Sequence, residues 1–239
     1  MNGPLTIFDI DGTLCDTFNV DDECFCAAVS QVLTIPVVLS SWEGAPHITD
    51  AGIADWLWRQ HLNRSPTADE IQALANAYEV ALARELQAAP HRFSVIGGVP
   101  ALLDHLFAAR WDIAIATGGW SRLARLKLAA AHIPEALLLA SSDDSYDRFE
   151  IFRLARDRAV QRRKSYHAKT VLVGDGTWDV QVAAAHGWCF LGVGKAQRAE
   201  RLLAEGASAV VEDFSDLPRV LDLLQHCSTP KVRRSHEAG

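Results

Sequence analysis

Two aspartates one residue apart, Asp9 and Asp11, stand at the end of a short apolar run and are followed at once by Gly12. The run from Leu5 to Phe8 is typical of a buried strand, and in an α/β protein such a strand delivers side chains to the sheet edge where ligands bind. Two carboxylates this close together repel each other, so burying both requires a cation or a shared proton. The pair therefore indicates chemistry; the alternative is an Asp-x-Asp-Gly turn whose carboxylates cap backbone amides.

A second acidic pair follows a second apolar run. Residues 170–173 lead into Gly-Asp-Gly-Thr-Trp-Asp, which contains Asp175 and Asp179. Hard divalent cations such as Mg²⁺ prefer a few carboxylate oxygens together with water and a substrate phosphate. Acidic groups from two strand ends thus predict a magnesium site, although Asp179 could instead cap its own helix.

Groups suited to a phosphate stand between the two acidic pairs. Thr117 and Gly118 follow the apolar run 113–116, and their hydroxyl and flexible amides could hold a phosphate oxygen. Thr117 could alternatively cap the helix expected from Ser121. Arg148, before a helical stretch that begins at Glu150, could offset the acidic charge with two hydrogen bonds to phosphate, and its alternative is a surface arginine.

These residues require a sheet to position them. From Ser94 onward, short apolar runs alternate with helical patterns, which predicts a mostly parallel sheet with helices on both faces. Residues from about 18 to 92 read as helices without strand-like alternation and indicate a helical insertion. The expected strands are residues 5–8, 111–116, 136–140, 170–173, 189–193 and, more weakly, 207–211.

Composition narrows the classes of function. The 239 residues are 49% hydrophobic and carry a formal charge of -7. No apolar run approaches the roughly 18 residues of a membrane helix, and the negative charge argues against broad binding to nucleic acid or an anionic membrane. The N-terminus lacks the features of a secretory signal, so we expect a cytoplasmic protein. The five cysteines lack CxxC spacing and indicate neither a disulfide framework nor a zinc site.

Together, the ordered motifs DIDGT, ATGG, an arginine-containing segment and GDGTWD resemble the haloacid dehalogenase-like hydrolase superfamily over roughly residues 5–215. The branch they resemble contains phosphoglycolate phosphatases and β-phosphoglucomutases. The resemblance implies an α/β, Rossmann-like parallel-sheet core with an inserted all-helical cap. We place the core at residues 1–15 and 93–226, the cap at 16–92 and a disordered tail at 227–239.

The resemblance also implies roles for individual residues. Asp9 would be the nucleophile, Asp11 the general acid and base, and Thr117 a ligand of the phosphate oxygens, with Gly118 beside it. Asp175 and Asp179 would hold Mg²⁺ together with Asp9 and the backbone carbonyl of Asp11.

One departure concerns the basic residue of the third motif. The family usually supplies a lysine there, and this chain has none between Lys127 and Lys164. Arg148 fits best by its place before Glu150, and Lys127 is the alternative. Arginine keeps the electrostatic role but cannot give up its proton.

The expected function is a magnesium-dependent phosphatase that hydrolyses a small phosphorylated metabolite through an aspartyl-phosphate. A phosphosugar mutase of the same superfamily and a catalytically silent binding or regulatory protein remain as alternatives. A cap without lysine argues against phosphonate hydrolysis through a Schiff base, which needs a primary amine. Substrate choice should reside in the cap, where His47, in the loop of residues 42–48, could contact substrate.

Overall fold

The computed structural model describes residues 3–38 and 44–231. The chain divides into two compact units. The first unit contains residues 1–14, 96–115 and 155–239, and the second contains residues 15–95 and 116–154. The expected cap, residues 16–92, falls inside the second unit, which also includes a stretch of chain that follows β2.

A six-stranded sheet organises the fold, with the strand order β3-β2-β1-β4-β5-β6. The pairs β1/β2, β1/β4, β4/β5 and β5/β6 are parallel. The strands are β1 (Leu5–Phe8), β2 (Asp112–Ala116), β3 (Leu138–Ala140), β4 (Thr170–Gly174), β5 (Cys189–Val193) and β6 (Val210–Val211). Every residue of β1 is buried, as expected for a parallel strand covered on both faces. The predicted parallel α/β fold is confirmed.

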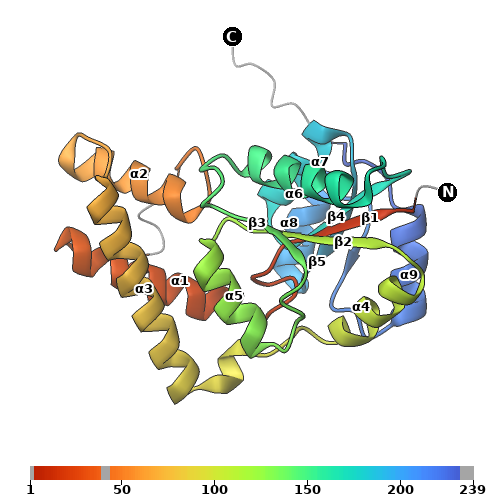
Figure 1. Ribbon diagram of the computed structural model, residues 1–239, viewed down its shortest axis with the longest axis horizontal. Coiled ribbons are helices and arrows are strands. Elements are labelled where there is room, and N and C mark those ends of the chain that lie inside the picture. The colour runs from red at the N-terminus through yellow and green to blue at the C-terminus, as the bar shows by residue number, and fades with distance from the viewer. Residues whose placement is uncertain (1–2, 39–43, 232–239) are drawn as a thin grey trace, which may run out of the picture. The chain divides into compact units, whose positions relative to one another are not determined.

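The register of β1 explains how the strand ends are aligned. Phe8 lies opposite Ile115 of β2 and Val173 of β4. The chain therefore leaves all three neighbouring strands at one edge of the sheet, and Figure 1 allows β1, β2 and β4 to be followed to that edge. This is the edge at which an open parallel sheet binds ligands.

The helices of the first unit cover the sheet. α7 (Thr177–His186) packs against β4, β5 and α8 (Ala196–Glu205), and α8 also packs against β5 and β6. α4 (Val99–Ala108) and α9 (Leu217–His226) also belong to this unit. After α9, Ser228 accepts a hydrogen bond from Phe190 N at 3.2 Å. Of the tail expected at residues 227–239, positions 232–239 lie outside the described residues.

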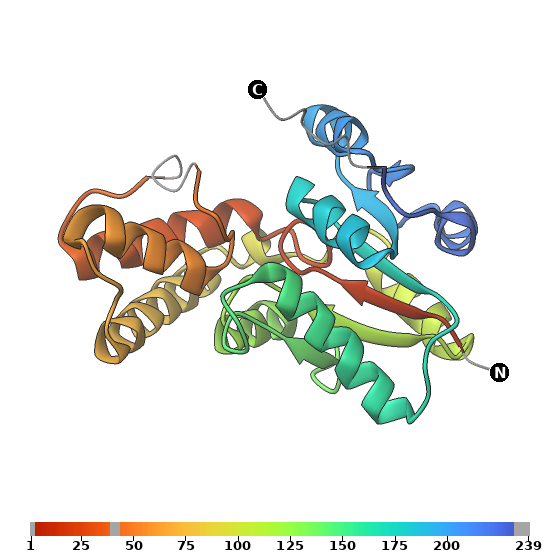
Figure 2. The ribbon, with the colours of Figure 1, turned by 90° about the horizontal axis from the view of Figure 1, so that it is seen from above.

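The second unit is mainly helical. It contains α1 (Phe18–Leu33), α2 (Asp50–Leu62), α3 (Ala68–Ala88), the short 3₁₀ helix η2 (Pro90–Phe93) and α5 (Ser121–Ala130), together with β3. Figure 2 shows α1, α2 and α3 as a group in red to orange. Phe25 of α1 meets Tyr78 of α3 edge to face at 5.4 Å, within a core that includes Trp58.

Local sequence signals explain where these helices begin. Thr67 and Glu70 form the predicted capping box of α3, in which each side chain accepts a hydrogen bond from the other's backbone N–H. Such a box satisfies two backbone donors that the first turn of a helix leaves unpaired. Leu74, Tyr78 and Leu82 lie buried on one face of α3, as the 3.6-residue periodicity predicts.

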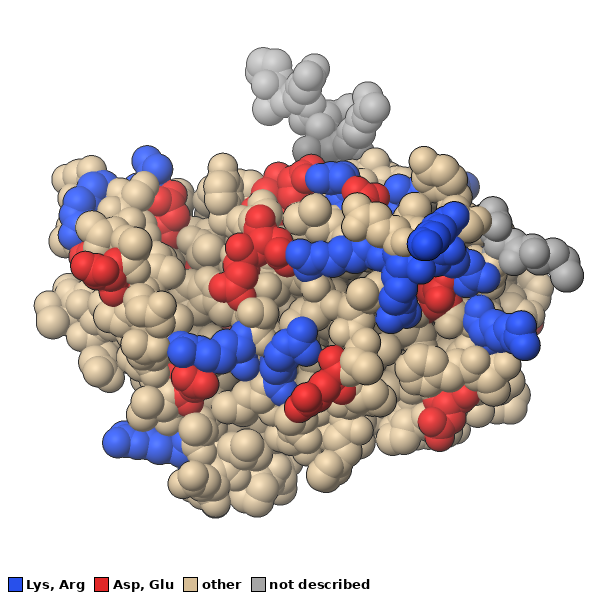
Figure 3. Space-filling model, in the orientation of Figure 1, with Lys and Arg blue, Asp and Glu red and all other residues tan. Residues whose placement is uncertain are grey.

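α6 (Arg148–Arg163) is strongly basic and runs from one unit into the other along the chain. Its sequence contains six arginines and only two acidic residues, and basic side chains gather on the face shown in Figure 3. Arg153 pairs with Glu150 at 2.7 Å, and Arg163 pairs with Asp112. Among residues 3–38 and 44–231, no helix combines the length and apolar character that crossing a membrane demands.

Candidate active site

Three buried carboxylates meet at the edge where β1 and β4 end. Asp9, Asp175 and Asp179 each offer an oxygen, and the three oxygens lie within 4.8 Å of one another. Asp9 directly follows β1, and its N–H donates to the carbonyl of Val173 at 3.0 Å. Asp9 and Asp175 are each 5% exposed, and Asp179 is fully buried. The structure thus brings together acids more than 160 positions apart in the sequence.

Asp179 both caps a helix and belongs to this cluster. It lies in the first turn of α7, where its Oδ2 accepts a hydrogen bond from Gly176 N at 3.1 Å. A Cβ atom added to Gly174 would lie 2.7 Å from the carboxyl carbon of Asp179. The absence of a side chain at position 174 therefore leaves room for the carboxylate. Asp179 caps α7, as the alternative interpretation predicted, and it also belongs to the acidic cluster.

Asp175 has a partner that the sequence did not indicate. Arg198, in the first turn of α8, donates from its NH1 to Asp175 Oδ2 at 2.6 Å. No motif identified Arg198, because it lies in a helix without a recognisable signature. Its position in the chain was the available signal. Arg198 follows β5 closely, and because β5 lies next to β4 in the sheet, the start of α8 lies at the same sheet edge as Asp175.

The side chain of Asp11 stands apart from the three clustered carboxylates. It is partly exposed, whereas the neighbouring Ile10 is fully buried. Gly12 follows with a φ of 77°, a left-handed conformation that glycine adopts without strain. This turn allows the chain to leave the sheet directly after the two aspartates.

The donor set suits a hard divalent cation. Each of the three buried residues provides carboxylate oxygens, which Mg²⁺ prefers, and the cluster contains no nitrogen or sulfur ligand. Burying several like charges within a few ångströms is unfavourable without a compensating cation. Three buried carboxylates that lie this close together therefore fit the expected metal.

Thr117 begins the segment of the second unit that the sequence predicts to bind phosphate oxygens. It directly follows β2 and is 1% exposed, and its N–H donates to Ala140 O at 3.1 Å. Its Oγ1 accepts from Gly119 N at 3.1 Å. The alternative in which Thr117 caps α5 is wrong, because the N-cap of that helix is Trp120.

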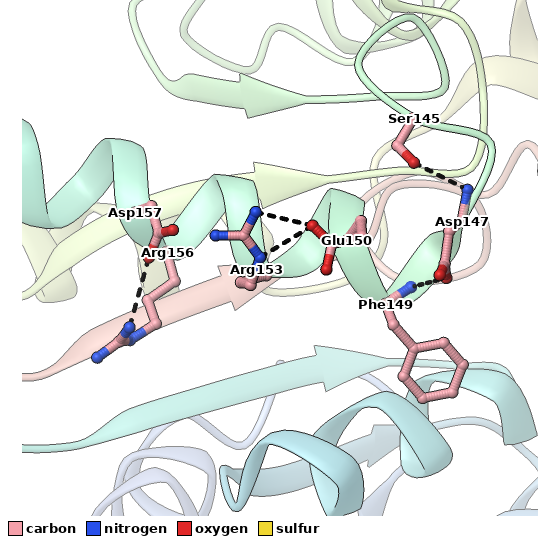
Figure 4. Close-up of polar contacts among 7 residues, drawn as sticks. All are labelled: Ser145, Asp147, Phe149, Glu150, Arg153, Arg156 and Asp157. Carbon is pink, nitrogen blue, oxygen red and sulfur yellow. Dashed lines mark hydrogen bonds and ion pairs between the residues drawn. The ribbon is translucent and has the colours of Figure 1, made fainter.

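Arg148 is the first residue of α6, and its guanidinium is buried. Asp147 caps this helix: its Oδ1 accepts from Phe149 N at 2.9 Å, while its own N–H donates to Ser145 Oγ (Figure 4). The Arg148 guanidinium carbon lies 5.1 Å from the ring centre of Phe152. The alternative of an exposed surface arginine is therefore wrong.

Arg148 lies beside Gly118. A Cβ atom at Gly118 would be 2.7 Å from Arg148 NH1, and the same nitrogen donates to Ile48 O at 3.4 Å. Within the second unit, the structure thus brings together Thr117, Gly118 and Arg148. A positive charge and a glycine backbone beside a buried hydroxyl suit an anion with several oxygens.

Asp50 is a second residue that the sequence analysis missed. It is buried at the start of α2, where its Oδ2 accepts from Trp120 N at 2.8 Å and its own N–H donates to Gly118 O at 2.8 Å. Thr49, the N-cap of α2, donates through its hydroxyl to Tyr146 O. The available sequence signal for this helix start was the pair Thr49-Asp50, because threonine and aspartate are common at the N-terminus of a helix.

Lys127, the alternative basic residue, is engaged in an ion pair. Its side chain is fully buried, and its Nζ lies 2.6 Å from Asp21 Oδ1 of α1. A Cβ atom at Gly119 would lie 3.9 Å from the same Nζ. Both candidate basic residues, Arg148 and Lys127, therefore lie near the segment that begins at Thr117.

His47 lies in the second unit among residues of the loop before α6. Its ring meets that of Tyr146 edge to face at 5.0 Å, and its Nδ1 lies 3.9 Å from Asp147 Oδ1. The side chain is 30% exposed. Residues 42 and 43 of the same expected substrate loop lie outside the described residues.

The chain belongs to the haloacid dehalogenase-like hydrolase family, whose model matches residues 5–187. This confirms the resemblance inferred from the four motifs. No curated protein matches the sequence.

Solved structures share the fold over almost the whole chain. A hydrolase from Pseudomonas syringae is 23% identical with a TM-score of 0.71, covering 93% of this chain and 98% of the other. A β-phosphoglucomutase from Clostridium difficile is 14% identical with a TM-score of 0.67, covering 91% and 95%. A predicted phosphoglycolate phosphatase from Haemophilus somnus is 17% identical with a TM-score of 0.62, covering 92% and 99%.

Proposed function

We propose that this hydrolase is a magnesium-dependent phosphatase that acts on a small phosphorylated metabolite through an aspartyl-phosphate on Asp9. The observation that carries the proposal is the meeting of Asp9, Asp175 and Asp179 within 4.8 Å at the carboxyl end of a parallel sheet. Family membership supports it, because the motifs that the family model spans contain all three acids.

The chain's own oxygens would hold the cation. Asp9, Asp175 and Asp179, with the backbone carbonyl of Asp11, are the proposed ligands. Bound Mg²⁺ supplies positive charge that neutralises the oxygens of the transferring phosphoryl group.

In the first step, ionised Asp9 attacks phosphorus. A bond forms between its carboxylate oxygen and phosphorus, and the bond from phosphorus to the leaving oxygen breaks. Asp11 donates a proton to that leaving oxygen. In the second step, Asp11 takes a proton from water, the water oxygen attacks phosphorus, and the bond to Asp9 breaks to release phosphate.

We assign Thr117, Gly118 and Arg148 to the phosphate oxygens. Thr117 follows β2 as Asp9 follows β1, and the two strands are parallel neighbours. Arg148 is favoured over Lys127 because its guanidinium lies directly beside Gly118. Residues 16–92 would form the cap that selects the substrate, with His47 as a contact.

A phosphosugar mutase is the second candidate, and the named β-phosphoglucomutase among the structural neighbours favours it. A mutase would share the aspartyl-phosphate and differ chiefly in excluding water from it. The two candidates are therefore separated by the fate of the phosphoryl group, which passes to water in a phosphatase and to a sugar hydroxyl in a mutase.

The test is release of inorganic phosphate from p-nitrophenyl phosphate by the full chain, with Mg²⁺ and with excess chelator. We expect turnover with Mg²⁺ that chelation abolishes and Mg²⁺ restores. A panel of phosphorylated metabolites, including sugar phosphates, then identifies the substrate by kcat/KM. Equal rates with and without chelator contradict the proposed metal dependence, and isomerisation of a sugar phosphate without phosphate release favours the mutase.

A further inference from the structure

We infer that Arg198 is a positioning residue for the proposed magnesium site, which orients the Asp175 carboxylate through an ion pair. The inference rests on the proposed function. It starts from the ion pair between Arg198 NH1 and Asp175 Oδ2 at 2.6 Å, in which the carboxylate is 3% exposed and the arginine 37% exposed. The arginine thus reaches a buried acid from the solvent side.

Two glycines fix the path of the Arg198 side chain. A Cβ atom at Gly194, directly after β5, would lie 2.8 Å from Arg198 Cγ and 3.0 Å from its Cδ. The aliphatic part of the arginine therefore lies against the bare backbone of residue 194. A side chain at position 194 would displace it from this path.

The guanidinium end is fixed by Gly12. A Cβ atom there would lie 2.8 Å from Arg198 NH1 and 2.7 Å from the carboxyl carbon of Asp175. The ion pair is therefore seated against the turn that follows Asp9 and Asp11. Residues at the ends of β1, β4 and β5 together fix the Asp175 carboxylate, which makes this more than a surface ion pair.

The chemistry of the pair suits this role. A carboxylate has two oxygens and can accept a hydrogen bond with one while binding a metal with the other. Carboxylates that bind metals are commonly oriented by such outer partners, and losing the partner typically costs 10–100-fold in metal affinity. Repulsion between the positive charges of the arginine and the cation opposes this effect. If repulsion were the larger effect, removal of Arg198 would strengthen metal binding. Because two glycines preorganise the arginine, we assign orientation as the larger effect.

Titration calorimetry of Mg²⁺ into the metal-free full chain tests the inference without substrate or turnover. We expect the dissociation constant to rise about 10–100-fold in Arg198→Ala and less in Arg198→Lys, which retains a donor and a charge. Arg201→Ala is the matched control, because Arg201 is an exposed arginine one turn later in α8. It should bind Mg²⁺ as the wild type does.

At saturating Mg²⁺, the KM of Arg198→Ala for p-nitrophenyl phosphate should stay within about twofold of wild type, since the residue acts through Asp175. Circular dichroism checks that each variant is folded, and Arg198→Lys serves if the alanine variant is not. Unchanged or tighter Mg²⁺ binding overturns the inference, as does a raised KM with unchanged metal affinity, which would make Arg198 a substrate ligand. A wild-type chain that binds no Mg²⁺ overturns the proposed function itself, and the inference with it.

Discussion

Lys127 and Asp21 form a buried ion pair that joins α5 to α1, with 2.6 Å between Nζ and Oδ1. The lysine side chain has no exposed surface, and the aspartate side chain is 17% exposed. The two residues lie 106 positions apart in the sequence. Separately, the Cys15 thiol donates to the backbone carbonyl of Lys127 at 3.9 Å.

Lys127→Met should destabilise the protein by about 3–5 kcal/mol, because it removes the cation that pairs with a largely buried carboxylate. The double variant Lys127→Met with Asp21→Leu should recover part of this loss, since both charges are then gone. Urea denaturation followed by circular dichroism gives the free energies of unfolding. Equal destabilisation in the single and double variants would show that the aspartate left behind by Lys127→Met carries no penalty, which would contradict the prediction.

Arg148→Gln should lower kcat/KM about 10²–10³-fold, the usual cost of removing a group that stabilises developing charge in a transition state. Arg148→Lys should be intermediate, because it keeps the charge but not the planar fork. Arg153→Gln is the control, since Arg153 lies on the same helix and pairs with Glu150 (Figure 4). If Arg148→Gln keeps wild-type activity, Lys127 becomes the better candidate.

Gly12→Ala and Gly187→Ala form a matched pair of backbone variants. Both glycines have positive φ, 77° and 69°, so alanine at either position carries a similar strain of about 1–2 kcal/mol. Gly187 has no atom within 4 Å of an added Cβ, whereas at Gly12 that Cβ meets the ion pair of Asp175 and Arg198. Mg²⁺ affinity by calorimetry should therefore fall only in Gly12→Ala. An equal loss of Mg²⁺ affinity in both variants would show that backbone strain alone causes the effect.

The lowered pKa of Asp112, at the start of β2, predicts that the stability of the fold depends on pH. Burial raises its pKa, but hydrogen bonds from Arg163 and His167 outweigh burial and hold the pKa below the ordinary value of 3.8. A lowered carboxylate pKa stabilises the fold above that ordinary value, and the stabilisation is lost as the pH falls through the folded-state pKa.

Asp112→Asn should therefore cost about 1–3 kcal/mol near neutral pH, because two partners lose a charged acceptor. Urea denaturation at a series of pH values should show the difference from wild type shrinking below pH 3.8. A difference that stays constant down to strongly acidic pH would contradict this role for the carboxylate.

Much of the fold could be predicted because its strands are short, apolar and buried. The predicted bounds of β1 and β5 agree with the structure, and those of β2 and β4 differ by one residue. β6 contains only Val210 and Val211 of the predicted 207–211, since a strand at the edge of a sheet has a partner on one side only. The clustering of Asp9, Asp175 and Asp179 followed from the rule that parallel strands end at one edge.

The ion pairs could not be predicted. Lys127 meets Asp21 only because segments distant in the chain come together, and no spacing in the sequence reveals the pair. For Asp175 and Arg198, positions after two neighbouring strands indicate the same sheet edge, but they do not reveal the contact itself. For Asp50, the Thr-Asp pair indicates a helix start, but the contact of its carboxylate with a backbone N–H seventy positions away depends on the fold. Strand ends give a local signal, whereas helix packing depends on the whole fold.

The most direct test of the account compares wild type with Asp9→Asn in the Mg²⁺-dependent hydrolysis of p-nitrophenyl phosphate. Asparagine has nearly the same size but cannot attack phosphorus as a carboxylate does. We predict that turnover falls by at least about 10⁴-fold, the scale expected for loss of a nucleophile, while circular dichroism shows a folded protein. Phosphate release by folded Asp9→Asn at a rate near that of wild type would contradict the aspartyl-phosphate mechanism.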